Sequence, residues 1–204
     1  MVLARRYQKR ATWWVMFLTA LSPSIWIIYK ALYDLLGADP AKEIVDFLGL
    51  WGLRFLLITL AVTTLRVWLD IRWLISFKRM LGLFCFYYVG LHLLGTLTFL
   101  MGWRLDLFVK EVTERPYIIL GMVAFLMLLP LAVTSTKGWQ RRLGRNWKRV
   151  HRLVYPASFF AVMHLVLLTR ASYWEAILYT VLLMILLGQR LKTKLNGVNW
   201  QRSA

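Results

Sequence analysis

The sequence predicts an all-α integral membrane protein: a bundle of six transmembrane helices with both termini in the cytoplasm. Three observations lead to this prediction. Of the 204 residues, 60% are hydrophobic and only 17% are charged. The apolar residues fall into six runs, each able to supply the roughly 20 residues that a membrane-spanning helix needs. The 26 Lys and Arg residues, against 9 Asp and Glu, lie almost entirely between these runs, so membrane topology explains the positive charge without a nucleic-acid partner.

The six runs define the expected spans in chain order. Backbone groups in lipid must be satisfied within each segment, which requires helices. Asp39 and Pro40 predict an N-cap and the first turn of a short helix that leads into the second span. Pro116 suits the first turn of the fourth span, where its missing N–H is not needed. No internal repeat or long linker divides the chain, so we expect a single domain over residues 1–204, with spans at 11–33, 47–69, 81–103, 116–136, 150–169 and 173–191.

The basic residues predict the orientation. Nineteen of the 26 lie in the two tails and in the second and fourth loops, and eight of the 9 acids lie on the opposite side. By the positive-inside rule the basic side is cytoplasmic. The same loops are expected to bind anionic lipid headgroups. The basic side comprises Arg5, Arg6, Lys9, Arg10, Arg66, Arg72, Lys78, Arg79, Lys137, Arg141, Arg142, Arg145, Lys148, Arg149, Arg152, Arg190, Lys192, Lys194 and Arg202.

Two of the three histidines fall at similar depth in different spans. His92 lies near the middle of the third span and His164 in the outer half of the fifth. At ~1.5 Å per residue, they differ in depth by only about 4–5 Å. Ionisable groups inside a membrane are costly and therefore candidates for function. The two imidazoles could ligate one haem iron from opposite faces, with Gly90 and Gly95 allowing the flat macrocycle to approach; alternatively, each could form an interhelical hydrogen bond.

His151 begins the fifth span at its cytoplasmic edge, about 20 Å from His164 along the helix. That spacing suits a second cofactor. On an ideal helix, however, the two side chains point roughly 140° apart, unless Pro156 kinks the helix. No histidine occupies the matching end of the third span, where Lys78 and Arg79 stand. His151 is expected either to bind a cofactor with a different partner or to lie among the interfacial charges.

Three further features limit the possible chemistry. Arg54 lies inside the second span, where it could snorkel to the outer surface or contact a haem propionate. Lys78, Arg79 and the basic fourth loop could hold the phosphate or carboxylate of a flavin or haem, or lipid headgroups. Cys85 is the single cysteine, which excludes an intramolecular disulfide and a thiolate-built metal centre and predicts a buried apolar role.

Short segments along nearly the whole chain carry a resemblance to a known family. They are residues 36–42 (LGADPAK), 78–84 (KRMLGLF), 91–93 (LHL), 115–117 (RPY), 134–136 (TST) and the stretch from Leu143 to His151. Together they resemble the MsrQ family, also called YedZ. This family consists of the haem-binding membrane subunits of bacterial periplasmic methionine sulfoxide reductase systems, within the ferric-reductase-like transmembrane superfamily.

The resemblance implies a haem b protein of the bacterial inner membrane that transfers electrons without being the catalytic subunit. It implies that electrons come from the quinone pool and pass to a periplasmic molybdopterin-containing methionine sulfoxide reductase subunit, and that FMN is associated with the protein. By position, His92 and His164 match the family's axial ligands to the haem iron, and His151 matches its third functional histidine. The acid-bearing outer loops, 34–46 and 104–115, would be the partner's docking surface.

Two other functions compete with this one. A stand-alone transmembrane ferric or cupric reductase of the same superfamily would usually carry a soluble flavin and nicotinamide domain, for which 204 residues leave no room. A small transporter or structural membrane protein would use its histidines only to bridge helices. Broken helices or a repeat with a polar pathway would favour the transporter.

Overall fold

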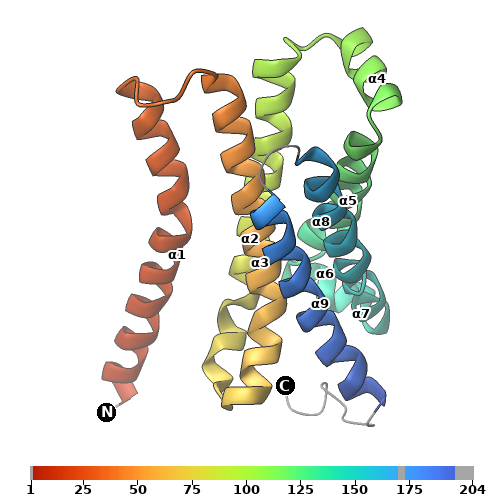
Figure 1. Ribbon diagram of the computed structural model, residues 1–204. Coiled ribbons are helices and arrows are strands. Elements are labelled where there is room, and N and C mark those ends of the chain that lie inside the picture. Colours follow the sequence, from red (N-terminus) through yellow and green to blue (C-terminus); the bar gives the residue numbers. More distant parts are fainter. Residues whose placement is uncertain (1, 170–172, 196–204) are drawn as a thin grey trace.

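The computed structural model describes the backbone of residues 2–169 and 173–195, and the side chains of these residues except 2–9, 67, 72 and 193–195. In this part of the chain all regular structure is helical (Figure 1). The elements are α1 (Val2–Leu32), α2 (Pro40–Leu69), η1 (Arg72–Leu74), α3 (Ile75–Gly95), η2 (Thr96–Leu100), α4 (Leu105–Glu114), α5 (Pro116–Val133), α6 (Lys137–Leu143), α7 (Arg145–His151), α8 (Val154–Leu168) and α9 (Tyr173–Leu195).

The predicted all-α membrane fold is confirmed. Among the described residues, 6 stretches are long and apolar enough to cross a membrane: Arg10–Leu32, Pro40–Arg66, Ile75–Leu100, Pro116–Val133, Arg145–Leu168 and Tyr173–Lys192. The described part of α1 begins at the end of the bundle where α9 ends (Figure 1). Of the basic residues in the orientation argument, Arg202 lies outside the described residues.

The predicted short helix before the second span is wrong. Asp39 does cap a helix, because its side chain accepts a hydrogen bond from the Lys42 amide at 3.0 Å. That helix is α2 itself, which runs without interruption from Pro40 to Leu69. Pro at the first helical position is pre-organised for the helix, and none of the following residues is a proline that would end it. The span therefore begins seven residues before its expected start.

The fifth span consists of two helices, α7 and α8. A turn at Arg152 and Leu153 separates them. Pro156 cannot donate a hydrogen bond to the carbonyl of Arg152, as a helical residue would, and that carbonyl instead accepts from the Tyr155 amide at 3.1 Å. The break therefore precedes the proline, and the ideal-helix angle between His151 and His164 does not apply.

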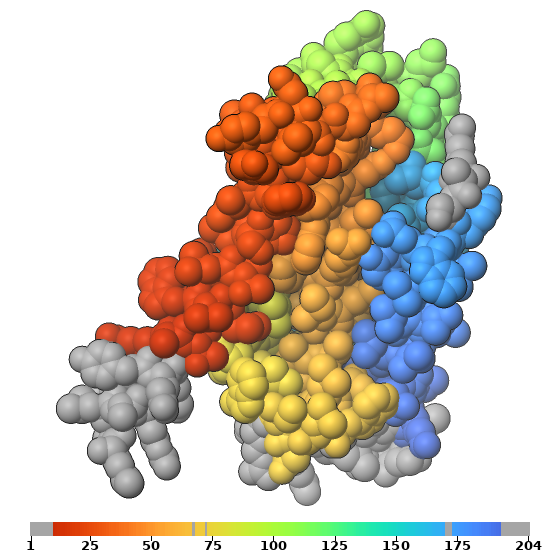
Figure 2. Space-filling model, turned by 60° about the vertical axis from the view of Figure 1, so that its left-hand side comes forward, coloured from red at the N-terminus to blue at the C-terminus, as the bar shows by residue number. Residues whose placement is uncertain are grey.

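The bundle is built around two closely packed helix pairs, α2 with α3 and α5 with α8. In Figure 2, α1 lies to one side of α2 and α9 to the other. Tyr88 of α3 is fully buried; its hydroxyl donates to the Ala20 carbonyl at 2.8 Å and accepts from the Ser24 amide at 3.2 Å, which ties α1 to the pairs. Cys85 is buried, as predicted.

Candidate functional site

His92 of α3 and His164 of α8 face each other between the two helix pairs. Their ring centroids are 6.3 Å apart, and the ring planes are nearly perpendicular, at 76°. Both side chains are half-buried. The depth estimate from the sequence thus placed the two imidazoles correctly relative to each other.

Each imidazole is held by a backbone carbonyl of the helix paired with its own. His92 Nδ1 lies 2.8 Å from the carbonyl oxygen of Val45 in α2, and His164 Nδ1 lies 2.6 Å from that of Tyr117 in α5. A carbonyl oxygen only accepts hydrogen bonds, so each Nδ1 carries the proton and donates it. The other ring nitrogen, Nε2, then carries the lone pair and can ligate a metal.

Both rings also lie against a glycine of the same neighbouring helix. A Cβ at Gly49 would come within 2.9 Å of His92 Nδ1, and a Cβ at Gly121 within 2.9 Å of His164 Nδ1. The glycines that were expected to make room, Gly90 and Gly95, do not meet the rings. Gly95 instead lies against the Val45 side chain, with 3.4 Å from its ideal Cβ position to Val45 Cγ2.

The separation of the two rings fits one metal ion between them. Two imidazoles that bind a metal from opposite sides, with bonds of about 2.0 Å, place their ring centres roughly 6 Å apart. Among the described residues, no group of three or more His, Cys, Asp or Glu could hold a bare metal ion. A metal whose remaining ligands come from a macrocycle, such as haem iron, needs only the two axial imidazoles. The residues present therefore fit haem better than a free ion.

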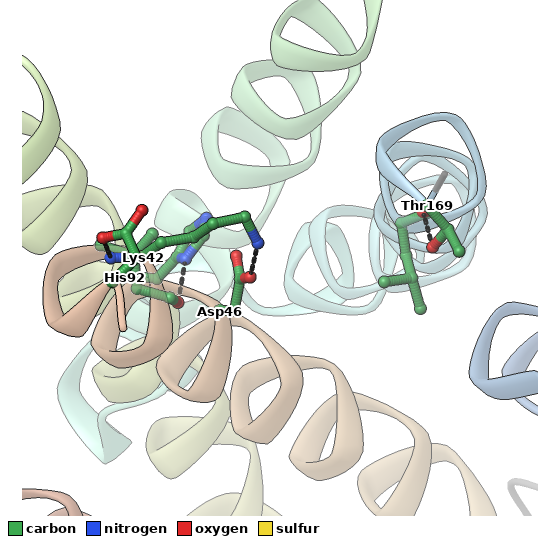
Figure 3. Close-up of polar contacts among 7 residues, drawn as sticks. Lys42, Asp46, His92 and Thr169 are labelled. Carbon is green, nitrogen blue, oxygen red and sulfur yellow. Dashed lines mark hydrogen bonds and ion pairs between the residues drawn. The ribbon is translucent and has the colours of Figure 1, made fainter. Parts of the chain in front are cut away.

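Charged residues lie beside this site at the outer ends of the helices. Figure 3 shows the ion pair between Lys42 and Asp46, on α2, next to His92. Lys30 forms another ion pair with Glu43. Farther out, Arg104 bonds Asp106 at 2.6 Å. Arg115 Nε bonds Glu111 at 2.7 Å. The acids of the expected docking loops are thus largely paired with neighbouring bases.

His151 lies apart from this pair, at the last residue of α7. Its ring stacks on Trp147, with centroids 3.9 Å apart and planes at 28°. Both residues line a cavity of about 1120 Å³, whose other walls come mainly from α2, α3, α5, α8 and α9. The structure therefore brings His92 and His164 together and leaves His151 as a separate candidate.

The cavity beside His151 is strongly cationic. None of its lining residues among those the structure describes is an acid. Lys78 Nζ donates to the Thr63 hydroxyl at 3.0 Å. Arg190 donates to the Tyr155 hydroxyl at 2.7 Å, while its buried Nε has no hydrogen-bond partner in the part of the chain that the structure describes. The basic residues that line the cavity are Arg66, Lys78, Arg79, Lys148, Arg152 and Arg190.

Arg54 is half-buried and points toward α9. Its Nε donates to the Tyr179 hydroxyl of α9 at 2.8 Å. Its Nη2 lies 3.6 Å from Glu175 Oε1, and its guanidinium stands over the Trp51 ring at 5.0 Å. It therefore joins α2 to α9.

Comparisons with known proteins identify the family to which the chain belongs. The ferric reductase like transmembrane component family matches residues 48–162. A protein of Xanthomonas oryzae pv. oryzae (strain MAFF 311018), described as the protein-methionine-sulfoxide reductase heme-binding subunit MsrQ, is 49% identical over 173 residues, which cover 84% of this chain and 79% of that one. The chain belongs to the MsrQ family. The MsrQ protein of Agrobacterium fabrum (strain C58 / ATCC 33970) is 39% identical over 189 residues, 93% of this chain and 87% of its own. No solved structure matches. The resemblance to the MsrQ family that the sequence segments carried is thus confirmed.

Four residues of the site were not found from the sequence: Val45, Gly49, Tyr117 and Gly121. The first and third contribute only a carbonyl, which every residue has, so their side chains give no signal. A signal was nevertheless present in the spacing. The same interval of 72 residues separates the two members of each corresponding pair: Val45 and Tyr117, Gly49 and Gly121, and His92 and His164 (117 − 45, 121 − 49 and 164 − 92). The repeat was not recognised in the sequence, because only these few positions show it.

Proposed function

We propose that this chain binds haem b between His92 and His164 and conducts electrons across the inner membrane to a periplasmic methionine sulfoxide reductase subunit that contains molybdopterin. The observation that carries the proposal is the pair of imidazoles at 6.3 Å, each with its Nδ1 proton on a carbonyl and its Nε2 available. The names of the MsrQ relatives, which are called heme-binding subunits of a protein-methionine-sulfoxide reductase, support it.

When bound, haem supplies a one-electron carrier inside a bilayer that electrons do not otherwise cross. The chain holds the iron ligands at fixed depth and orientation. The carbonyls of Val45 and Tyr117 keep the protons on Nδ1 and raise the basicity of the ligating nitrogens. In this proposal the side chains of the site only hold the haem, and the methionine sulfoxide is reduced on the partner subunit.

The direction of transfer follows from the charges. The loops rich in Lys and Arg, and with them both termini, lie in the cytoplasm by the positive-inside rule. The two facing histidines are then nearer the periplasmic side, beside the Lys42–Asp46 pair (Figure 3). A partner docked on this end would be separated from His92 by little more than the first turns of α2. The paired acids and bases there can steer its approach and fix its orientation.

At the cytoplasmic end, the cationic cavity holds a second anionic cofactor, and we assign FMN to it. The cavity of about 1120 Å³ is large enough for a flavin nucleotide. Lys78 and Arg190 can bind its phosphate, and the buried Arg190 Nε, which has no hydrogen-bond partner among the described residues, is available as a donor. The stacked rings of Trp147 and His151 offer an aromatic wall for the flavin. Reducing equivalents from a quinol of the membrane would reach the haem from this side.

The test is a native extraction of the protein followed by haem quantification and a redox-titrated visible spectrum. We expect about one haem b per chain at the His92–His164 site. Reduced protein should then be reoxidised by the periplasmic reductase subunit only when methionine sulfoxide is present.

Two results would contradict the proposal. Protein extracted without any haem absorption band would exclude the cofactor. Reoxidation by ferric or cupric ions, but not by the reductase subunit with methionine sulfoxide, would show a stand-alone metal reductase instead.

A further inference from the structure

The two facing histidines are held by the same structural device, used twice. In each case a histidine donates its Nδ1 proton to the carbonyl of residue i of the neighbouring helix, and its ring lies on residue i+4 of that helix, a glycine. The first set is Val45, Gly49 and His92, and the second is Tyr117, Gly121 and His164. Residues 47 positions apart form the hydrogen bond in both sets.

The carbonyl and the glycine belong together for a steric reason. In an α-helix the carbonyl of residue i points toward the amide of residue i+4, so the side chain of residue i+4 would stand beside that carbonyl. At Gly49 a Cβ would lie 2.9 Å from Nδ1 and 3.0 Å from Cε1 of His92; at Gly121 the same two atoms of His164 would lie at 2.9 and 3.1 Å. Only a residue without a side chain lets the imidazole reach the carbonyl's second lone pair.

Glycine is otherwise a poor choice at these positions. Inside a helix it is less favourable than alanine by about 1 kcal/mol. Gly90, on the same helix as His92, would meet nothing within 4 Å if a Cβ were added, whereas Gly49 and Gly121 would each clash with a ring. The helix gains nothing from Gly49 or Gly121 by itself, so both glycines are explained by the imidazoles that they admit.

We propose that Gly49 and Gly121 are positioning residues that set the orientation of the two haem-ligating imidazoles. This inference rests on the proposed haem site. We call each set of carbonyl and glycine a clamp: Val45 with Gly49 on α2, and Tyr117 with Gly121 on α5. The angle between the two ring planes that the clamps hold is 76°. Each clamp fixes one ring plane through the carbonyl bond and the glycine contact together. Neither glycine touches the metal, so each acts only through its histidine.

The test uses Gly49→Ala and Gly121→Ala, with Gly90→Ala as the matched control. A new methyl group must push each ring by roughly half an ångström to restore an ordinary contact, which lengthens or breaks the Nδ1 hydrogen bond. Loss of such an outer contact lowers metal affinity by about 10–100-fold. It also makes the ligand less basic, so the midpoint potential of the haem should rise.

Electron paramagnetic resonance gives the decisive readout, because the low-spin ferric signal depends on the angle between two axial imidazole planes. Near-perpendicular planes give a highly anisotropic signal with one large g value, and parallel planes give an ordinary rhombic signal. We expect both glycine variants to move away from the wild-type g values and to show a higher potential. Gly90→Ala should keep the wild-type spectrum and potential.

The outcomes separate this inference from the function that it rests on. Wild-type protein without haem would refute the proposed function. Haem that is lost on substitution of His92 or His164, but shows wild-type g values and potential in both glycine variants, would refute the clamps alone. If one glycine variant fails to accumulate, the other tests the same claim on a different helix, and the wild-type spectrum tests the perpendicular planes directly.

Discussion

The two ends of the bundle use histidine differently. Toward the outer end, His92 and His164 face each other at 6.3 Å, each fixed by a carbonyl and a glycine. Toward the opposite end, where α7 and α9 end, His151 stacks on Trp147 beside a cationic cavity. Corresponding residues of the two halves of the His92–His164 site are 72 positions apart. The residue that corresponds to His151 in this way is Arg79 (151 − 72 = 79), which lines the same cavity. The repeat thus places two imidazoles at one level and an arginine opposite a histidine at the other.

This difference shows what the pair of histidines requires. An imidazole pair needs a histidine in both halves of the repeat and a glycine on each neighbouring helix to admit it. The end of the bundle near His151 instead gathers six bases around a cavity, which favours a ligand with its own negative charge. A metal held by two imidazoles and an anion held by cations are therefore expected at separate depths in the same bundle.

The largest expected effect comes from His92→Ala and His164→Ala. Each removes one axial ligand, and because loss of even an outer contact lowers metal affinity by about 10–100-fold, haem content should fall at least tenfold. His151→Ala is the matched control, since His151 lies in the other region and should leave the band of this haem in place. Haem quantification in the three variants makes the measurement. Wild-type haem content in both ligand variants would contradict the comparison.

The next effect concerns the cationic cavity. Lys78→Met and Arg190→Met each remove a half-buried charge that the flavin phosphate would meet. A charge-assisted hydrogen bond contributes about 1.5–3 kcal/mol, so the Kd for FMN should rise roughly 10–100-fold. Fluorescence titration of the flavin-free protein measures it, with the exposed Arg104→Met as the control. Unchanged FMN affinity in both cavity variants would show that the flavin binds elsewhere.

A smaller effect separates packing from ligand orientation. A Cβ at Gly52 would lie 2.6 Å from Val89 Cγ2 and 3.3 Å from the Val89 amide nitrogen, so Gly52→Ala forces α2 and α3 apart without touching a histidine ring. Overpacking of this kind costs about 1–3 kcal/mol. We expect a lower thermal midpoint in detergent while the haem signal keeps its wild-type g values. Changed g values without loss of stability would mean that the helix spacing, and not the glycine clamps, orients the rings.

The smallest effect is expected at the exposed outer end. The hydrogen bond from Arg104 lowers the pKa of Asp106. A carboxyl group whose pKa is lower in the folded than in the unfolded chain stabilises the fold at pH values above its unfolded pKa, about 3.9 for Asp. This contribution is lost as the pH falls through the pKa of the folded state. Because both side chains are exposed, Asp106→Asn should leave the thermal midpoint at neutral pH and the haem content unchanged. A clear loss of haem in this variant would mean that the two regions do not act separately.

The sequence was sufficient for the all-α membrane fold and its six spans, because the length and hydrophobicity of each span depend only on local composition. The depth match of His92 and His164 could also be predicted, since helices are rigid and rise by a constant amount per residue. Pro156 indicated a possible kink, but not that the helix would end at His151, because the alternative hydrogen bond from the Tyr155 amide to the Arg152 carbonyl appears only in the folded chain. The convergence of Lys78 and Arg190 on one cavity was likewise hidden, because these residues lie on α3 and α9.

The glycines show most clearly why the rest was not predictable. Gly49 and Gly121 look like ordinary glycines of apolar spans, and their role appears only when a ring from another helix is placed on them. Gly90 and Gly95 are nearer to His92 in the sequence, which is why the sequence predicted them, and not Gly49, as the glycines that make room. Proximity along a helix does not decide what a side chain meets; the neighbouring helix does.

The electron paramagnetic resonance spectrum of oxidised wild-type protein, extracted under native conditions, tests the central claim most directly. His92 and His164, held at 76°, should give a low-spin ferric haem with a strongly anisotropic signal dominated by a single large g value. A rhombic low-spin signal, a purely high-spin signal or no haem signal would contradict a haem clamped between these two perpendicular rings.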